Sequence, residues 1–292
     1  MKFVTARHKE VPFVGLVNES GSAVLPLNLS KEPNLPLTLV ECIALGDAFI
    51  ETVKQIVTNS HELDYLPIDD VTLLAPIPRP GKNIFCVGKN YAEHAIEMGS
   101  ADDIPEHVMV FTKAPTSVIG PNEMVLNHQE ITQQLDYEGE LAVIIGKKGR
   151  AIKREEALEY VFGYTIINDV TARDLQARHK QFFIGKSLDT TCPMGPWIVH
   201  KNMIGSPNEL DIETRVNGEV RQSSNTRNFI FPVEEVISVL SAGMTLEPGD
   251  IIATGTPAGV GKGFKPPKFL HAGDRMEITV EGIGTLKNTI QS

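Results

Sequence analysis

From residue 83 onward, glycine, proline, asparagine and aspartate divide the chain into short apolar runs, and this pattern limits the folds open to it. Short aliphatic and β-branched runs bounded by turn-forming residues predict strands. The runs read NIFCVG, MVFTK, ELAVIIG, YTIIND, WIVH, IETRVNG, DIIATG and RMEITVEGIGTL. Helical patterns are fewer, at residues 92–98, 155–161 and 233–243. Because helices and strands do not alternate regularly, we expect a β-rich α+β domain, and a doubly wound sheet or a TIM barrel is disfavoured.

The first 72 residues predict a small N-terminal domain with a strand at residues 13–17 and a helix at about 37–58. Prolines then alternate with other residues in APIPRP, which favours an extended connection and forbids a helix. We therefore expect a boundary near residue 72, with a catalytic domain over residues 73–292. The N-terminal part holds no catalytic constellation.

Charge and cysteine content exclude several classes of protein. Among 292 residues, 37 are acidic and 27 are basic, giving a net charge near −10, the wrong sign for binding nucleic acid or an anionic membrane surface. Three distant cysteines, Cys42, Cys86 and Cys192, support neither a disulfide framework nor a thiolate zinc site. Charged residues interrupt the N-terminal apolar segment, and no apolar run is long enough to span a membrane. We expect a cytoplasmic protein with neither nucleic acid nor membrane as a partner.

The segment DYEGELAVIIG carries an unusual row of acids. On a strand, Asp136, Glu138 and Glu140 would project to one side and repel one another unless a positive charge lies between them, which a divalent cation could supply. The continuation LAVIIG is typical of a buried strand, and Gly139 would leave room for a ligand. The alternative is a solvated face of an edge strand.

Asp169 ends a second apolar strand, in GYTIINDVTARD. It could instead be a turn residue or a helix N-cap. Together, Glu138, Glu140 and Asp169 offer three hard oxygen donors, a set that suits Mg²⁺ or Mn²⁺.

Two further segments contain candidate catalytic groups. Lys186, in FIGKSLDTTCP, could place an ammonium against an anionic substrate or an enolate, although a single lysine is usually on the surface. His94 and Glu97 stand three residues apart in GKNYAEHAIEMG, a spacing that makes them neighbours on a helix. A carboxylate there would fix the imidazole tautomer and raise its basicity, as a general base requires, but an ordinary surface pair has the same spacing.

The glycine-rich segment GDIIATGTPAGVGKG follows an apolar strand. It matches neither the dinucleotide fingerprint nor the P-loop, so nucleotide binding is not expected. Its backbone N–H groups and the Thr256 hydroxyl could still bind a carboxylate, and a plain multi-glycine turn is the alternative.

Six ordered motifs over some 200 residues resemble the fumarylacetoacetate hydrolase family, in particular its bacterial, YisK-like oxaloacetate decarboxylase and acylpyruvate hydrolase branch. They are GKNYAEH, DYEGELAVIIG, GYTIINDVTARD, GKSLDTTCP, VNGEVRQ and GDIIATGTPAGVG. The resemblance implies a mixed, highly curved β-roll, usually as a homodimer. The residue roles that it implies are metal ligation by Glu138, Glu140 and Asp169, water activation by His94 and Glu97, and substrate or enolate binding by Gln176, Lys186 and Thr256.

One departure from the family narrows the expected substrate. The founding eukaryotic enzymes carry a fourth acidic ligand before the catalytic histidine, whereas IFCVGKNY has no carboxylate. The resemblance therefore implies metal-dependent C–C cleavage of a small 2-oxo dicarboxylic acid through a pyruvate enolate. Oxaloacetate decarboxylation and hydrolysis of a fumarylpyruvate-like acylpyruvate both fit. Isomerase or hydratase action on unsaturated dicarboxylates, or a non-enzymatic metal-binding scaffold, are the alternatives.

Overall fold

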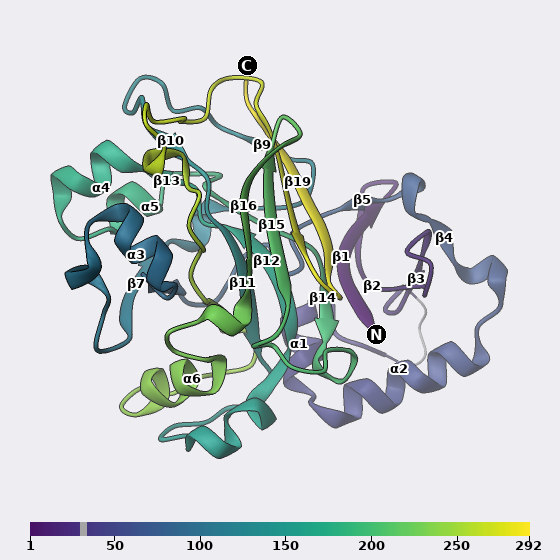
Figure 1. Cartoon of the computed structure of the whole chain (residues 1–292). Coiled ribbons are helices and arrows are strands. Elements are labelled where there is room, and N and C mark those ends of the chain that lie inside the picture. Colours follow the sequence, from purple (N-terminus) through teal and green to yellow (C-terminus); the bar gives the residue numbers. More distant parts are fainter. Residues whose placement is uncertain (30–33) are drawn as a thin grey trace.

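The computed structural model describes residues 1–29 and 34–292, and it is dominated by two sheets (Figure 1). The larger sheet has the order β4-β3-β2-β1-β14-β12-β11-β17-β6-β7, with β5 paired to β1 and β8 paired to β14. Its strands are β1 (Lys2–His8), β2 (Val11–Val17), β3 (Ala23–Pro26), β4 (Leu66–Pro67), β5 (Thr72–Leu73), β6 (Ile84–Gly88), β7 (Met109–Lys113), β8 (Val118–Ile119), β11 (Gly139–Ile145), β12 (Val161–Asn168), β14 (Cys192–His200) and β17 (Ile251–Ala253).

A second sheet packs against the centre of the first and has the order β16-β15-β18-β19-β9. Its strands are β9 (Met124–Val125), β15 (Asp211–Val216), β16 (Glu219–Asn225), β18 (Arg275–Val280) and β19 (Gly284–Ile290), while β10 (Leu135–Asp136) and β13 (Thr171–Ala172) form a separate pair. Most pairings are antiparallel, but β17 runs parallel to β6, β19 to β9 and β14 to β8. The expected β-rich α+β fold with mixed sheets is confirmed.

Alternation along β11 divides the core into two layers. Leu141 and Val143 pack with residues of β15 and β18 between the sheets, whereas Ala142 and Ile144 pack on the opposite face with N-terminal residues. Every residue of β11 is buried, as the run LAVIIG predicted.

The N-terminal part shares a sheet and a core with the rest of the chain. Strand β1 is antiparallel to β14, with Phe3 opposite Ile198. The Phe3 ring lies 5.1 Å from that of Phe49 and 5.4 Å from that of Phe162. The division of the chain at residue 72 stays a prediction.

The helices agree only partly with the sequence pattern. They are α1 (Leu39–Ala44), α2 (Asp47–Asn59), α3 (Ala92–Met98), α4 (Arg173–His179), α5 (Phe183–Lys186) and α6 (Val233–Ser241). The single helix expected at 37–58 is wrong, because the chain breaks between α1 and α2 at Gly46, whose φ of +60° a helix cannot accept. The pattern at 155–161 forms a 3₁₀ helix at Arg154–Tyr160 and then enters β12. Helices α4 and α5 were not predicted.

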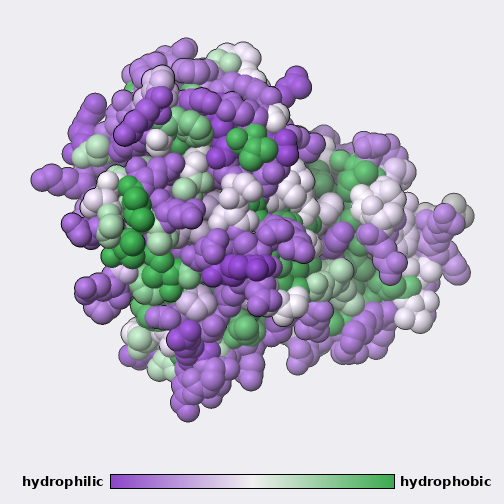
Figure 2. Space-filling view, in the orientation of Figure 1, coloured by the Kyte–Doolittle hydropathy of each residue, from purple (hydrophilic) through white to green (hydrophobic). Residues whose placement is uncertain are grey.

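The face shown in Figure 2 is mostly hydrophilic, with scattered apolar side chains. None of the helices that the structure describes is both long and apolar enough to cross a membrane.

Candidate active site

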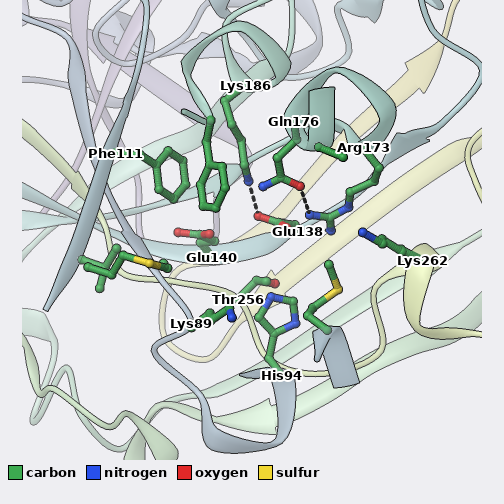
Figure 3. A pocket seen from close by; sticks show the side chains of 16 residues that line it. Lys89, His94, Phe111, Glu138, Glu140, Arg173, Gln176, Lys186, Thr256 and Lys262 are labelled. Atoms are coloured by element: carbon green, nitrogen blue, oxygen red, sulfur yellow. Dashed lines mark hydrogen bonds and ion pairs between the residues drawn. The ribbon is translucent and has the colours of Figure 1, made fainter. Parts of the chain in front are cut away.

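A cavity of about 200 Å³ opens between helices α3, α4 and α5 and the end of β11 (Figure 3). Its volume suits a small ligand. Six of the residues singled out in the sequence line it, and Glu97 and Asp169 lie next to lining residues. The lining includes His94, Glu138, Glu140, Gln176, Lys186 and Thr256, together with Lys89, Phe111, Arg173 and Lys262.

Strand pairing brings the three predicted metal ligands together. Gly139 on β11 is opposite Asn168 on β12, so Asp169 reaches Glu138, and its N–H donates to the Glu138 carbonyl at 2.8 Å. One carboxylate oxygen from each of Glu138, Glu140 and Asp169 lies within 4.8 Å of the others. All three side chains are buried, which excludes the alternative of a solvated strand face.

Buried cations contact two of these carboxylates. Lys186 Nζ lies 2.6 Å from Glu138 Oε2 and 2.7 Å from Asp169 Oδ2. Lys113 Nζ, fully buried at the end of β7, lies 2.8 Å from Asp169 Oδ1. Arg173 Nη2, at the start of α4, lies 2.7 Å from Glu138 Oε1. Lys186 is therefore part of the charge balance of the triad and not a surface lysine.

Asp136, expected in a row with Glu138 and Glu140, belongs to the same network but is not one of the three clustered carboxylates. Its Oδ2 accepts from Arg173 Nε at 2.8 Å, and its carboxylate also accepts the backbone N–H groups of Gly261 and Lys262 at 2.6 and 3.0 Å. Asp136 thus connects the arginine of the site to the loop that follows β17.

Among the residues that the structure describes, no lysine or arginine forms an ion pair with Glu140, which accepts the backbone N–H of Gly255 at 2.8 Å. Burial and the nearby charges of Asp169 and Glu138 raise its pKa well above the usual range. Glu138 behaves oppositely, because Lys186 and Arg173 outweigh the effect of burial and lower its pKa. Once Glu140 is ionised, as metal ligation requires, four carboxylates including Asp136 face three buried cations, and one negative charge is in excess.

This arrangement fits a divalent cation. Every donor in the triad is a carboxylate oxygen, the ligand type that Mg²⁺ and Mn²⁺ prefer. The two nearby thiols are poor competitors, because burial raises the pKa of Cys192 to about 12 and that of Cys86 well above its usual range. A cation of charge +2 would leave the site positive and suited to an anionic ligand.

The proposed role of Gly139 is wrong. A Cβ at this position would meet Thr214 Oγ1 at 2.3 Å and Ile278 Cγ2 at 3.0 Å, both on the second sheet. Gly139 faces away from the triad because neighbouring residues on a strand point to opposite sides. The glycine allows the two sheets to approach, and it makes no room for a ligand.

His94 and Glu97 lie on α3, as predicted, with His94 Nδ1 3.4 Å from Glu97 Oε2. The imidazole is buried and faces the cavity beneath Glu138 (Figure 3). The Glu97 oxygens also accept the N–H of Gly259 at 2.9 and 3.1 Å. The glycine-rich loop therefore holds the carboxylate that orients the histidine.

Gln176 and Thr256 line the cavity in different ways. Gln176 Oε1 accepts from Arg173 Nη1 at 3.3 Å, which leaves its NH₂ group facing the cavity (Figure 3). The Thr256 hydroxyl donates to the Gly139 carbonyl at 3.0 Å and accepts from Gln222 Nε2 at 2.7 Å. To donate to a substrate, Thr256 would have to give up the bond to Gly139.

Sequence reasoning missed Lys113 and Arg173. Arg173 stands in the quoted motif VTARD, four residues after Asp169, which on a helix start places it beside the strand end. Lys113 ends the run MVFTK. In each case the sequence offered a charged residue at or beside the end of a strand, but not its partner.

Comparisons with known proteins agree with this geometry. Residues 83–291 match the family model described as fumarylacetoacetate (FAA) hydrolase C-terminal. The chain belongs to the fumarylacetoacetate hydrolase family, and it is an enzyme of that family, so the alternative of a non-enzymatic scaffold is set aside.

Individual relatives are similar over nearly the whole chain. Oxaloacetate tautomerase YisK of Bacillus subtilis is 55% identical over 99% of this chain and 100% of its own. The mitochondrial oxaloacetate tautomerase FAHD2A of Bos taurus is 42% identical over 98% of this chain and 89% of its own. The solved structure of a fumarylacetoacetate hydrolase from Exiguobacterium antarcticum superimposes with a TM-score of 0.86, at 45% identity, over 100% of this chain and 99% of that one.

Proposed function

We propose that the protein is a divalent-cation-dependent oxaloacetate tautomerase. It interconverts the enol and keto forms: in the ketonising direction the C2 hydroxyl loses its proton and C3 gains one. The enol is an unsaturated dicarboxylate, so this reaction falls within the isomerase alternative drawn from the sequence. Relatives with that name, similar over nearly the whole chain, support it over C–C cleavage.

The observation that carries the proposal is a histidine facing the same cavity as a buried oxygen-donor triad. When bound there, a divalent cation supplies Lewis-acid stabilisation of negative charge on the C2 oxygen. Lys186 adds a fixed positive charge beside Glu138 and Asp169. The Gln176 NH₂ group binds a carboxylate oxygen of the 2-oxo acid and orients it.

His94 moves the proton at C3. Its Nδ1 faces Glu97, so its Nε2 is the nitrogen that serves the cavity. A neutral imidazole takes a proton from C3 in one direction, and the imidazolium returns it in the other. Glu97 holds the ring and stabilises the imidazolium.

A second candidate is C–C cleavage through the same enolate, either decarboxylation of oxaloacetate or hydrolysis of an acylpyruvate. The observation that favours it is that a histidine paired with a carboxylate can also activate water. Decarboxylation would release the distal carboxylate as CO₂ and leave the electron pair in the enolate. Hydrolysis would need hydroxide at the distal carbonyl.

One experiment separates these candidates. Enol oxaloacetate is added to the protein with Mg²⁺ or Mn²⁺, and the loss of enol absorbance is recorded together with pyruvate release. The proposal predicts enol loss well above the rate in metal and buffer alone, without matching pyruvate. Pyruvate release as fast as enol loss would favour cleavage, and a rate equal to that of the buffer would contradict the proposal.

We propose a homodimer and a cytoplasmic location for this chain, with a small 2-oxo acid as its partner and neither nucleic acid nor membrane. The Bos taurus relative is named as mitochondrial, so location varies among relatives.

A further inference from the structure

Lys262 occupies a fixed place at the edge of the active-site cavity. It lies in the 3₁₀ turn Gly261–Gly263 after β17. Its backbone N–H donates to Asp136 Oδ2 at 3.0 Å, and that oxygen also accepts from Arg173 Nε at 2.8 Å. The main chain of Lys262 is therefore tied to the arginine that contacts Glu138.

The side chain of Lys262 points into the cavity (Figure 3). Within the part of the chain that the structure describes, its ammonium makes no ion pair with a carboxylate. Partial burial and then the charge of Arg173 lower its pKa. Lys89 lines the same cavity but lies 2.8 Å from Asp103. Lys262 is thus an unpaired cation beside a second cation, which an anion would stabilise.

We propose that Lys262 binds the second carboxylate of a dicarboxylic 2-oxo acid and so selects dicarboxylates over monocarboxylates. This inference rests on the proposed function, because it assumes that the first carboxylate and the keto oxygen lie at the triad. Arg173 already pairs with Asp136 and Glu138, so its charge is largely compensated, whereas that of Lys262 is not. The flexible four-carbon stem lets the ammonium follow the distal group.

Binding of the second carboxylate by Lys262 can be tested with two ligands that have no keto group to enolise. L-Malate and L-lactate can both chelate a metal through a carboxylate and a hydroxyl, but only malate has a second carboxylate. Their dissociation constants for the Mg²⁺-loaded protein are measured by calorimetry for the wild type, Lys262→Met and Lys262→Arg. The matched control is Lys89→Met, on the same cavity.

The wild type should bind malate more tightly than lactate. Lys262→Met should reduce this preference about tenfold or more, the scale of a hydrogen bond to a charged group, and should leave lactate binding unchanged. Lys262→Arg should restore most of the preference, and Lys89→Met should retain it. Thermal stability of Lys262→Met should match the wild type, because the hydrogen bond from Lys262 to Asp136 is made by the backbone N–H, which the substitution keeps.

An unchanged malate-to-lactate ratio in Lys262→Met would overturn the inference, and so would a wild type without preference for malate. These outcomes are separate from the proposed function. Lys262-dependent malate binding in a protein that does not ketonise oxaloacetate would disprove the tautomerase and keep the dicarboxylate site. Tautomerase activity together with an unchanged malate-to-lactate ratio in Lys262→Met would keep the tautomerase and disprove the dicarboxylate site.

Discussion

At the scale of single residues, the site is a balance of buried charges in which Lys186 takes part. Lys186 Nζ touches both Glu138 and Asp169, so it cannot be removed without consequence for the fold. A lysine that served only the substrate could be replaced without loss of stability. The sequence showed the residue, but its partners lie 48 and 17 positions away, and only the pairing of β11, β12 and α5 brings them together.

Lys186→Met should lower the melting temperature of the EDTA-treated protein, because Glu138 and Asp169 each lose one of their two buried cations and keep only Arg173 and Lys113. Removing one partner of an isolated buried pair costs about 3–5 kcal/mol, and the remaining cations reduce that cost. Mg²⁺ should raise the melting temperature of this variant by more than it raises that of the wild type, since the metal replaces part of the missing charge. Thermal unfolding with and without Mg²⁺ measures both. If Lys186→Met and the wild type had the same melting temperature, both with and without Mg²⁺, Lys186 would have no structural role.

His94 offers the second prediction at this scale. His94→Gln should slow ketonisation of oxaloacetate by a factor of about 100 or more, the usual contribution of a general acid–base group. Mn²⁺ affinity should stay within about twofold, because His94 is not one of the three carboxylate ligands. Stopped-flow absorbance and Mn²⁺ titration measure the two effects. A variant as fast as the wild type would remove His94 from the mechanism.

At the scale of elements, the glycine-rich loop after β17 connects several parts of the site. Gly259 donates its N–H to Glu97, and its φ is +103°. A Cβ there would meet the Arg221 carbonyl oxygen at 2.0 Å. The sequence predicted a loop whose backbone N–H groups could bind a carboxylate. These groups do bind carboxylates, but they are those of the enzyme's own Glu97, Asp136 and Glu140.

Gly259→Ala should therefore displace the loop, release Glu97 and lower activity about tenfold or more while the triad still binds Mn²⁺. The matched control is Gly205→Ala, because a Cβ at Gly205 meets nothing within 4 Å and its φ is not positive. Activity and Mn²⁺ affinity are measured for both variants. Full activity in Gly259→Ala would show that the loop does not position the dyad.

His200, the last residue of β14, should make the free energy of unfolding depend on pH. Burial, the N-terminal amine and Lys201 lower the pKa of His200 to about 4, whereas in the unfolded chain it would be about 6.5. Protonation then favours the unfolded chain, so stability should fall as the pH falls from about 6.5 to 4. His200→Gln should lose less stability over this range than the wild type does. Melting curves of both proteins are recorded at pH 7 and pH 5. If the melting temperature fell equally in the wild type and in His200→Gln, this role of His200 would be contradicted.

Local sequence patterns correctly predicted the elements in which apolar residues recur with one clear period. They failed where a single backbone angle or a long-range contact determines the structure. The alternation in DYEGELAVIIG correctly placed Glu138 and Glu140 on one side of a buried strand. The role predicted for Gly139 was wrong because the residues that pack against it, Thr214 and Ile278, lie on the second sheet and are distant in sequence. The break at Gly46 was missed because apolar spacing continues across it.

At the scale of the whole molecule, the large sheet runs without interruption from the N-terminal strands to the catalytic ones. Sequence composition shifts near residue 72, but hydrogen bonding between β1 and β14 crosses that point. Such pairing between distant segments cannot be predicted from local pattern. The family motifs did predict the fold and the members of the triad.

A truncated chain that begins at residue 73 should show no cooperative thermal unfolding transition. It would lack Phe3 and Phe49, which cover Phe162, and it would leave the edge of β14 unpaired. Differential scanning calorimetry and size-exclusion chromatography test this. A cooperative transition with retained Mn²⁺ binding would instead show that residues 73–292 fold as an independent domain.

If ketonisation needs a cation held by the carboxylate triad, the rate of enol loss must depend on free Mn²⁺. This rate is measured as a function of free Mn²⁺ for the wild type and for Glu140→Gln. Because the Glu140 pKa is raised, glutamine mimics its neutral form, and the EDTA-treated variant should fold as the wild type does. We predict that EDTA abolishes the wild-type rate and Mn²⁺ restores it along a saturating curve. Glu140→Gln should need at least tenfold more Mn²⁺. Full activity in excess EDTA, or identical curves for the two proteins, would contradict the account.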